Sequence, residues 1–210
     1  QPAAALDPAL RAAYRDYIKR FPKSEYVPQL ARELAAQAAD AGESDELRPI
    51  VALLQQNFPE HATTQALAAA LHRTEQLGRP FWLAAEQADG PPVDTREWLG
   101  DVVLIVVWSS QTEASRLTVR AVEEFRKTHR QVRVVGICVD LNLPAGDGGL
   151  EAERAPWPLV HDGLGFAGEF VRTWGIDQAP AVMVIDRDGN LAGCRVDASW
   201  IDVANDALRP

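Results

Sequence analysis

The stretch Val102-Val-Leu-Ile-Val-Val-Trp-Ser-Ser-Gln-Thr-Glu-Ala-Ser-Arg116 decides the fold of this chain. It opens with an apolar run over residues 102–108, which predicts a strand that is buried on both faces of a sheet. A helical pattern follows and extends to about residue 129. Ser110 and Glu113 match the S-x-x-E capping box, so we expect the helix to begin there. The stretch therefore predicts the strand–helix part of an α/β unit.

Strands and helices continue to alternate after this unit, and a short apolar segment at 81–85 before it predicts an edge strand. We expect the later elements over Val132–Val139, Phe166–Trp174, Ala181–Ile185, Leu191–Val196 and Trp200–Leu208. Asp186-Arg-Asp-Gly189 predicts a hairpin turn between two of these strands. The order of elements predicts an α/β fold, with a mixed sheet that helices flank on both faces.

Residues 1–77 have a different pattern, and we expect a small all-α domain there, followed by the α/β domain over residues 78–210. Apolar residues recur at helical spacing in four segments of the first part. Phe-Pro occurs at 21 and 58, a period of 58 − 21 = 37 residues, and each copy precedes an Ala-rich helix. This pattern resembles the helical hairpins of tetratricopeptide-type repeats, whose period is roughly 34. An ordinary antiparallel helical bundle is the alternative, and the sequence leaves both open.

Composition limits the partners of this chain. It has 210 residues and a formal net charge of −9. The acidic balance argues against nucleic acid and against anionic membrane surfaces as main partners. No apolar run approaches the ~20 residues that a membrane helix needs, so no transmembrane segment is expected. No export signal or membrane anchor is recognisable in the sequence.

Four segments of the second part occur in an order that resembles a known family. They are Gly90-Pro-Pro-Val-Asp-Thr-Arg-Glu-Trp-Leu-Gly100, Val102–Trp108, Val134-Val-Gly-Ile-Cys-Val-Asp140 and Trp174-Gly-Ile-Asp-Gln-Ala-Pro-Ala-Val-Met-Val-Ile-Asp-Arg-Asp-Gly189. Together they resemble the TlpA-like redoxins of the thioredoxin-like superfamily, which are extracytoplasmic thiol–disulfide oxidoreductases. The resemblance covers about residues 78–210. It implies a thioredoxin-like sheet there and an extracytoplasmic or periplasmic location.

The resemblance also places the active site of that family, whose pattern is W-A-x-W-C-x-x-C-R. Thr112 and Ser115 stand where the family has its two redox cysteines, and Arg116 matches the basic residue that follows. Pro180 matches the family's cis-proline. The resemblance therefore implies a groove, without its reactive pair, that is formed by Trp108, Gln111, Thr112, Ser115, Ala179 and Pro180.

Two hydroxyl groups cannot replace the two thiols chemically. Disulfide exchange needs a thiolate and a second thiol that resolves the mixed disulfide. A helix N-terminus stabilises an anion by at most ~2 kcal/mol, and a shift of one pKa unit corresponds to ~1.4 kcal/mol. Thr112 and Ser115 would therefore need an adjacent base to act as nucleophiles. Capping of the helix is the interpretation that we prefer for these residues.

The two cysteines, Cys138 and Cys194, form no C-x-x-C motif. Both fall in predicted strands, where an unmodified cysteine behaves as a small apolar side chain. In the strand order of the family, three spacings of ~4.8 Å separate them by ~14 Å, whereas a disulfide needs ~5.5 Å. We therefore expect two reduced, separate thiols. Asp140, His161 and Asp162 are candidate metal ligands, but a turn explains them better, so no metal or cofactor is expected.

Two classes of function remain. The favoured hypothesis is a redox-inactive binding or scaffold module in the cell envelope, with a protein or peptide as its partner. The alternative is a thiol–disulfide oxidoreductase that uses Cys138 or Cys194, or a divergent activity at Thr112, Ser115 and Pro180. The sequence predicts no oligomeric state.

Overall fold

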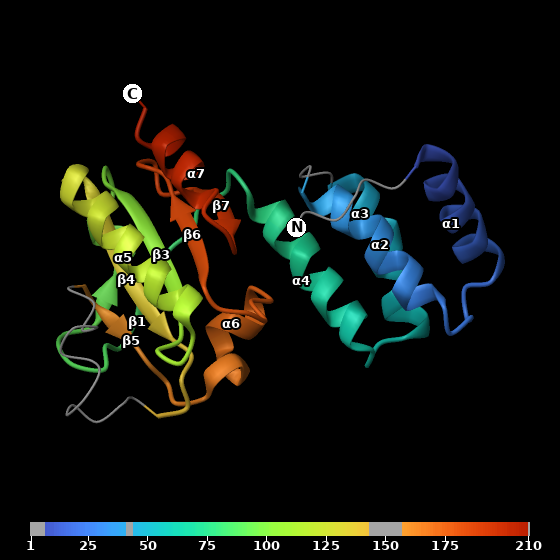
Figure 1. Cartoon of the computed structure of the whole chain (residues 1–210), viewed down its shortest axis with the longest axis horizontal. Coiled ribbons are helices and arrows are strands. Elements are labelled where there is room, and N and C mark those ends of the chain that lie inside the picture. Colours follow the sequence, from blue (N-terminus) through green and yellow to red (C-terminus); the bar gives the residue numbers. More distant parts are fainter. Residues whose placement is uncertain (1–6, 41–43, 143–156, 210) are drawn as a thin grey trace. The chain divides into compact units, whose positions relative to one another are not determined.

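A computed structural model describes residues 7–40, 44–142 and 157–209 of the chain (Figure 1). The chain divides into two compact units. One consists of Gln1–Glu75 with Thr173–Gly175, and the other consists of Gln76–Arg172 with Ile176–Pro210. Each unit is described by itself.

The first unit is built from four helices around an apolar core. Asp7 begins the first helix, because its carboxylate accepts a 2.8 Å hydrogen bond from the Ala9 amide and Pro8 occupies the first turn. Buried side chains from all four helices, among them Ile18, Leu34 and Leu67, form the core. The assignment to tetratricopeptide-type repeats remains a prediction. The helices are α1 (Pro8–Arg20), α2 (Val27–Asp40), α3 (Ser44–Asn57) and α4 (Ala62–Gln76).

The second unit contains the predicted mixed sheet, which has five strands in the order β5-β4-β3-β6-β7. The pairs β3–β4 and β4–β5 are parallel, whereas β3–β6 and β6–β7 are antiparallel. The expectation of an α/β fold with a thioredoxin-like sheet is therefore confirmed. The strands are β3 (Val102–Trp108), β4 (Val132–Cys138), β5 (Leu159–Val160), β6 (Ala181–Ile185) and β7 (Leu191–Arg195), and the helices are α5 (Glu113–Thr128), α6 (Glu169–Thr173) and α7 (Trp200–Ala207).

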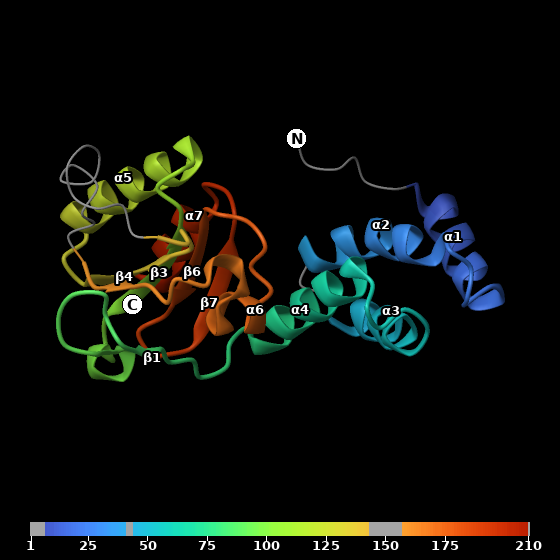
Figure 2. The same cartoon turned by 90° about the horizontal axis from the view of Figure 1, so that it is seen from below.

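Helices cover both faces of this sheet, with α5 and α7 on one side and α6 on the other (Figure 2). All seven residues of β3 are buried, as expected for a central strand that is covered on both faces. Its even-numbered side chains pack in one cluster with Val122 and Phe125 of α5 and Trp200 of α7. Burial of this strand fixes the point at which the chain leaves the sheet and enters α5.

The segment 81–85 forms less sheet than its apolar pattern predicts. Only β1 (Ala84–Ala85) is a strand, and it pairs with β2 (Val93–Asp94) in a separate two-stranded sheet. Leu83 extends the pairing only in part: its oxygen accepts a 2.9 Å hydrogen bond from the Thr95 amide, but its own amide donates to the Thr95 hydroxyl at 2.9 Å. A side chain has taken the place of one backbone acceptor there.

The helix expected at 166–174 is also interrupted. A short 3-10 turn, η2 (Gly165–Ala167), precedes α6, and Gly168 separates them. The Asp162 carboxylate lies where a Cβ of residue 168 would be, and it accepts a 2.8 Å hydrogen bond from the Leu164 amide. This carboxylate fixes the turn in place of a continuous helix.

Two buried indole groups lie over Gly136 in the middle of β4. An added Cβ at this position would be 2.9 Å from Nε1 of Trp157 and 3.2 Å from Nε1 of Trp108. Both tryptophans are buried, and both belong to the core cluster between the sheet and α5. Rigid, buried rings cannot move aside cheaply, so the sheet needs a residue without a side chain here.

We expect Gly136→Ala to lower the free energy of unfolding by about 1–3 kcal/mol, as overpacked cores do. Urea denaturation measures this value. In a Trp157→Phe background, which removes the indole Nε1, the same substitution should cost clearly less. Equal costs in both backgrounds would show that the indole contact is not the cause.

Candidate functional site

The turn between β3 and α5 carries most of the candidate site. Thr112 begins α5, since its hydroxyl accepts a hydrogen bond from the Ser115 amide at 3.3 Å. The prediction that Ser110 caps this helix is wrong. The Ser110 amide instead donates to Oδ2 of Asp140 at 2.9 Å, which ties this part of the turn to the end of β4.

The carboxylate of Asp140 organises this turn from the neighbouring strand. Asp140 is only 2% exposed, and its Oδ1 accepts a 2.5 Å hydrogen bond from the Ser109 hydroxyl. Oγ of Ser109 in turn accepts a 3.2 Å hydrogen bond from the Gln111 amide. A buried carboxylate is stable only when it is hydrogen-bonded in this way. The network therefore fixes both the direction of the chain after β3 and the position of Gln111.

Hydrogen bonding keeps Asp140 ionised. Burial raises the pKa of its carboxyl group, but hydrogen bonds from Ser109, Ser110 and Cys138 outweigh burial and hold the pKa below its ordinary value. A carboxylate with a low pKa is a weak general base at neutral pH. Asp140 is therefore suited to organising the turn and poorly suited to activating the Ser109 hydroxyl.

The two positions that match the redox pair hold hydroxyl groups in contact with each other. Oγ1 of Thr112 lies 2.8 Å from Oγ of Ser115. Ser115 is fully buried, and its Oγ accepts a 3.1 Å hydrogen bond from the Ser109 amide. Thr112 is exposed, so only the first of the two positions faces solvent. Both hydroxyls are used to stabilise the start of the helix.

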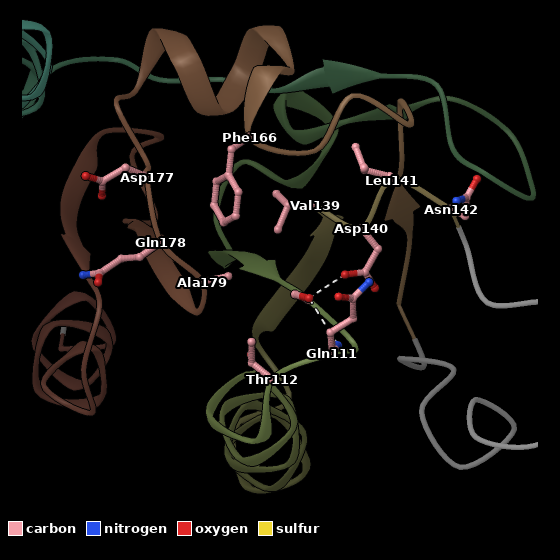
Figure 3. Close-up of a pocket in the computed structure, with 11 residues that line it drawn as sticks. Gln111, Thr112, Val139, Asp140, Leu141, Asn142, Phe166, Asp177, Gln178 and Ala179 are labelled. Atoms are coloured by element: carbon pink, nitrogen blue, oxygen red, sulfur yellow. Dashed lines mark hydrogen bonds between the residues drawn. The ribbon is translucent and has the colours of Figure 1, made fainter. Parts of the chain in front are cut away.

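A cleft of about 530 Å³ lies beside this turn, between three other segments of the unit (Figure 3). The end of β4 and the residues after it, 139–142, form one wall, and residues 177–179 form another. The ring of Phe166 points into the space between these walls. The peptide bond Ala179–Pro180 is cis. The cleft thus combines an apolar ring, polar side chains and two stretches of irregular backbone.

Of the six residues predicted for the groove, Gln111, Thr112 and Ala179 line the cleft. Trp108 and Ser115 are 2% and 0% exposed and lie in the interior. Pro180 is half-buried next to Ala179 and is not part of the lining. The predicted set therefore mixes residues of the cleft with residues that support it.

The structure adds Ser109, Asp140 and Phe166 to the site. The first two follow neighbouring parallel strands, whose carboxyl ends meet at one edge of the sheet, so the sequence carried a signal for them. It carried no such signal for Phe166, which a long connection brings to the cleft. His161 donates a 2.7 Å hydrogen bond through Nε2 to the backbone oxygen of Asp140. Within residues 7–40, 44–142 and 157–209, no three His, Cys, Asp or Glu residues are grouped as metal ligands would be.

Neither thiol lies in the lining of the cleft, and neither forms a disulfide. Cys138 and Cys194 lie on β4 and β7, three strands apart in the sheet order, which confirms the prediction of two separate thiols. Burial, with a smaller contribution from the charge of Asp140, raises the pKa of Cys138 to about 11. Only about one molecule in 10⁴ would carry the reactive thiolate at pH 7.

A comparison with protein families places this chain. A family model described as Redoxin matches residues 61–205, which is well over half of the chain. The chain belongs to the redoxin family. A comparison with curated proteins finds no match.

Solved structures similar to this chain are thiol–disulfide oxidoreductases. One described as a thiol:disulfide interchange protein DsbE from Chlorobium tepidum has 19% identity and a TM-score of 0.53, over 61% of this chain and 94% of that one. A thioredoxin-family thiol:disulfide interchange protein from Chlorobium tepidum TLS has 22% identity and a TM-score of 0.51, over 62% and 95%. A thiol-disulfide oxidoreductase from Bacteroides fragilis NCTC 9343 has 13% identity and a TM-score of 0.52, over 61% and 98%. At these identities the likeness establishes the thioredoxin-like fold.

We expect Asp140→Asn to lower the free energy of unfolding by about 2 kcal/mol at pH 7, because hydrogen bonds to a charged group contribute roughly 1.5–3 kcal/mol. The pKa of Asp140 in the folded protein lies below its value of ~3.9 in the unfolded chain, so the extra stability of the wild type over the variant is fully present above pH ~3.9. This extra stability should disappear as the pH falls through the lower pKa of the folded protein.

Urea unfolding as a function of pH measures this difference. Asp188→Asn, at an exposed position of the β6–β7 hairpin, is the matched control and should change stability little at any pH. A difference for Asp140→Asn that persisted at the lowest pH would contradict the charge-based explanation.

Proposed function

We propose that this redoxin-family chain is a redox-inactive binding module, which holds an extended polypeptide segment in the cleft beside Thr112 and Ala179–Pro180. One observation carries the proposal: hydroxyls that are hydrogen-bonded to each other occupy both redox positions, next to a cleft of about 530 Å³. Oxygen cannot form the mixed disulfide that electron transfer requires. The shape of the site is retained, and its reactive atoms are not.

Apolar side chains around the cleft support a peptide ligand. Phe166 is 44% exposed, Leu141 is 67% exposed and Leu164 is 56% exposed. Leu141 lies against the turn that carries Phe166, since a Cβ at Gly165 would be 3.2 Å from its Cδ2. Exposed apolar groups that are gathered at a polar cleft are typical of protein-interaction sites.

Polar groups of the lining suit an extended backbone. Gln111, Asn142 and Gln178 supply amide groups that can donate to and accept from a peptide main chain. Asp177 adds a negative charge, so a ligand segment with few acidic residues fits this cleft best. These features favour a protein or peptide partner over a small apolar molecule.

The alternative, thiol–disulfide exchange through one of the two remaining cysteines, has less support. Cys138 is buried, and its raised pKa leaves little thiolate at neutral pH. Cys194 lies on β7, two strands away from the strand that leads into the site. A hydrolytic activity at Thr112 or Ser109 lacks an adjacent base, since Asp140 has a lowered pKa.

The proposal includes an extracytoplasmic location, on the basis of the resemblance to TlpA-like redoxins. In the part of the chain that the structure describes, no helix is long and apolar enough to cross a membrane. The proposal also takes residues 1–77 as a separate helical domain, and this domain would offer a second surface for a protein partner.

We expect the full chain to bind a permanently unfolded, S-carbamidomethylated protein, whose blocked thiols carry no added charge, and Phe166→Ala to weaken this binding about tenfold, as loss of an aromatic anchor does. Fluorescence anisotropy of the labelled ligand measures the affinity. Leu99→Ala removes an apolar side chain outside the cleft that is even more exposed than Phe166, and it should leave the affinity unchanged. Equal losses in the two variants, or no binding at high concentration, would refute the assignment of the cleft.

Redox activity is tested by insulin reduction with dithiothreitol, in which the wild type should not exceed background. Thr112→Cys combined with Ser115→Cys is the positive control. Because the two hydroxyl oxygens are 2.8 Å apart, the paired thiols should form a disulfide, and the first should titrate below ~8.5 at the helix N-terminus. Wild-type catalysis that is lost on Cys138→Ala or Cys194→Ala would establish the alternative function.

A further inference from the structure

A second cleft, of about 560 Å³, lies at the opposite end of β4. The last turn of α5, the start of β4 and residues 157–158 surround it. Among the described residues, no Asp or Glu belongs to its lining. Four cationic side chains thus line this cleft, although the chain as a whole has a net charge of −9. The side chains that matter here are Trp98, Arg126, Lys127, Arg130, Arg133 and Trp157.

Two of the four cations are already neutralised by neighbouring carboxylates. Lys127 lies 3.2 Å from Glu123 and 2.9 Å from Glu124. Arg133 is bound through Nε to Asp101 at 2.8 Å. The positive charge that remains available in this cleft comes from the other two residues.

Arg126 and Arg130 have no carboxylate partner among the residues that the structure describes. Nε of Arg126 is buried and has no hydrogen-bond acceptor there. A buried donor without an acceptor costs about 1–3 kcal/mol. A ligand that carries carboxylates would bind the terminal nitrogens of these two guanidinium groups, since Nε of Arg126 is itself out of reach of a ligand, and a guanidinium group binds a carboxylate with two parallel hydrogen bonds.

Among the described residues, no strand covers the first half of β4 on the side of this cleft. β5 pairs with β4 only at Gly136 and Ile137. Over 132–135, none of the described residues forms a strand on that side of β4. The Gly136 amide donates to the Pro158 oxygen at 2.9 Å, so the backbone groups of Val134, two residues earlier, point to the same side. Val132 and Val134 also line the cleft.

We propose that this cleft binds an acidic, extended peptide segment of another protein. The segment pairs with this edge of β4 at Val134, while its carboxylates bind Arg126 and Arg130. Strand addition of this kind takes its affinity from main-chain hydrogen bonds and its specificity from side-chain contacts. Trp98, which is only half-buried, supplies rigid apolar surface for the remaining side chains of the segment.

Two other ligand classes fit less well. A nucleic acid has no backbone amide groups that can extend a sheet, so it would leave the edge of β4 unused. A single small anion would fill only a fraction of the 560 Å³ and would leave the strand edge unused. An acidic peptide can bind the two arginines, fill the cleft and pair with the edge of β4 at the same time.

The experiment titrates the full-length chain against a labelled peptide of alternating glutamate and valine at low ionic strength, with anisotropy as the readout. Arg126→Gln combined with Arg130→Gln should weaken binding at least about tenfold, which corresponds to ~1.4 kcal/mol. Arg120→Gln removes one positive charge from α5 outside the cleft, as Arg126→Gln alone does inside it, and should have little effect. Circular dichroism confirms that each variant is folded.

Two further ligands test the mode of binding. The same peptide with an N-methyl group on every residue keeps its charge but has no main-chain N–H groups with which to pair with a strand, so it should bind at least about tenfold more weakly. A single-stranded oligonucleotide of equal charge should bind more weakly than the peptide.

The proposal is overturned if the unmodified peptide fails to bind, or if Arg120→Gln weakens binding as much as the paired substitution. Unchanged affinity of the N-methylated peptide would also overturn it, as would tighter binding of the oligonucleotide. Phe166→Ala should leave acidic-peptide binding intact, because that residue belongs to the other cleft.

Discussion

The hydrogen bonds that the buried Asp140 carboxylate accepts from Ser109 and Ser110 are the constraint on which the candidate site depends. They join the end of β4 to the turn that follows β3, and so they set where α5 begins. The energetic reason is strong, because a buried carboxylate without donors costs far more than the hydrogen bonds themselves provide. Once this turn is fixed, the backbone places Thr112 at the N-terminus of α5 and Gln111 at the cleft.

The same constraint explains how the redoxin fold can persist when hydroxyl groups stand at Thr112 and Ser115. The interactions that hold the site together run through oxygen and backbone atoms, and none of them needs the two sulfurs of the family pattern. The Thr112 hydroxyl donates to the Ser115 hydroxyl and accepts from the Ser115 amide, while the Ser115 hydroxyl accepts from the Ser109 amide. Cys138, the sulfur nearest to Asp140, is buried with a raised pKa, which suits an apolar core residue better than a nucleophile.

β4 connects the two clefts of the second unit. The first cleft lies beyond its carboxyl end at Asp140, and the second lies at its start beside Val132 and Val134. At ~3.3 Å per residue, eight residues separate the two by about 25 Å, so two ligands could bind without touching. The first cleft is rimmed by apolar side chains and the second by cations, so they would select segments of different composition.

The sequence by itself determined the central strands and much of the fold. The apolar runs at 102–108 and 181–185 predict β3 and β6 with the bounds that the structure has, because a strand covered on both faces needs an unbroken apolar run. The motif also predicts Gln111, Thr112 and Ala179. Only the tertiary structure decided that Asp140 holds the turn, that Phe166 enters the cleft and that cations meet at the start of β4. The physical reason is that Asp140 lies 31 residues from Ser109 in the sequence. Strand register and loop paths bring two such residues into hydrogen-bonding distance, and local sequence patterns do not encode either of them.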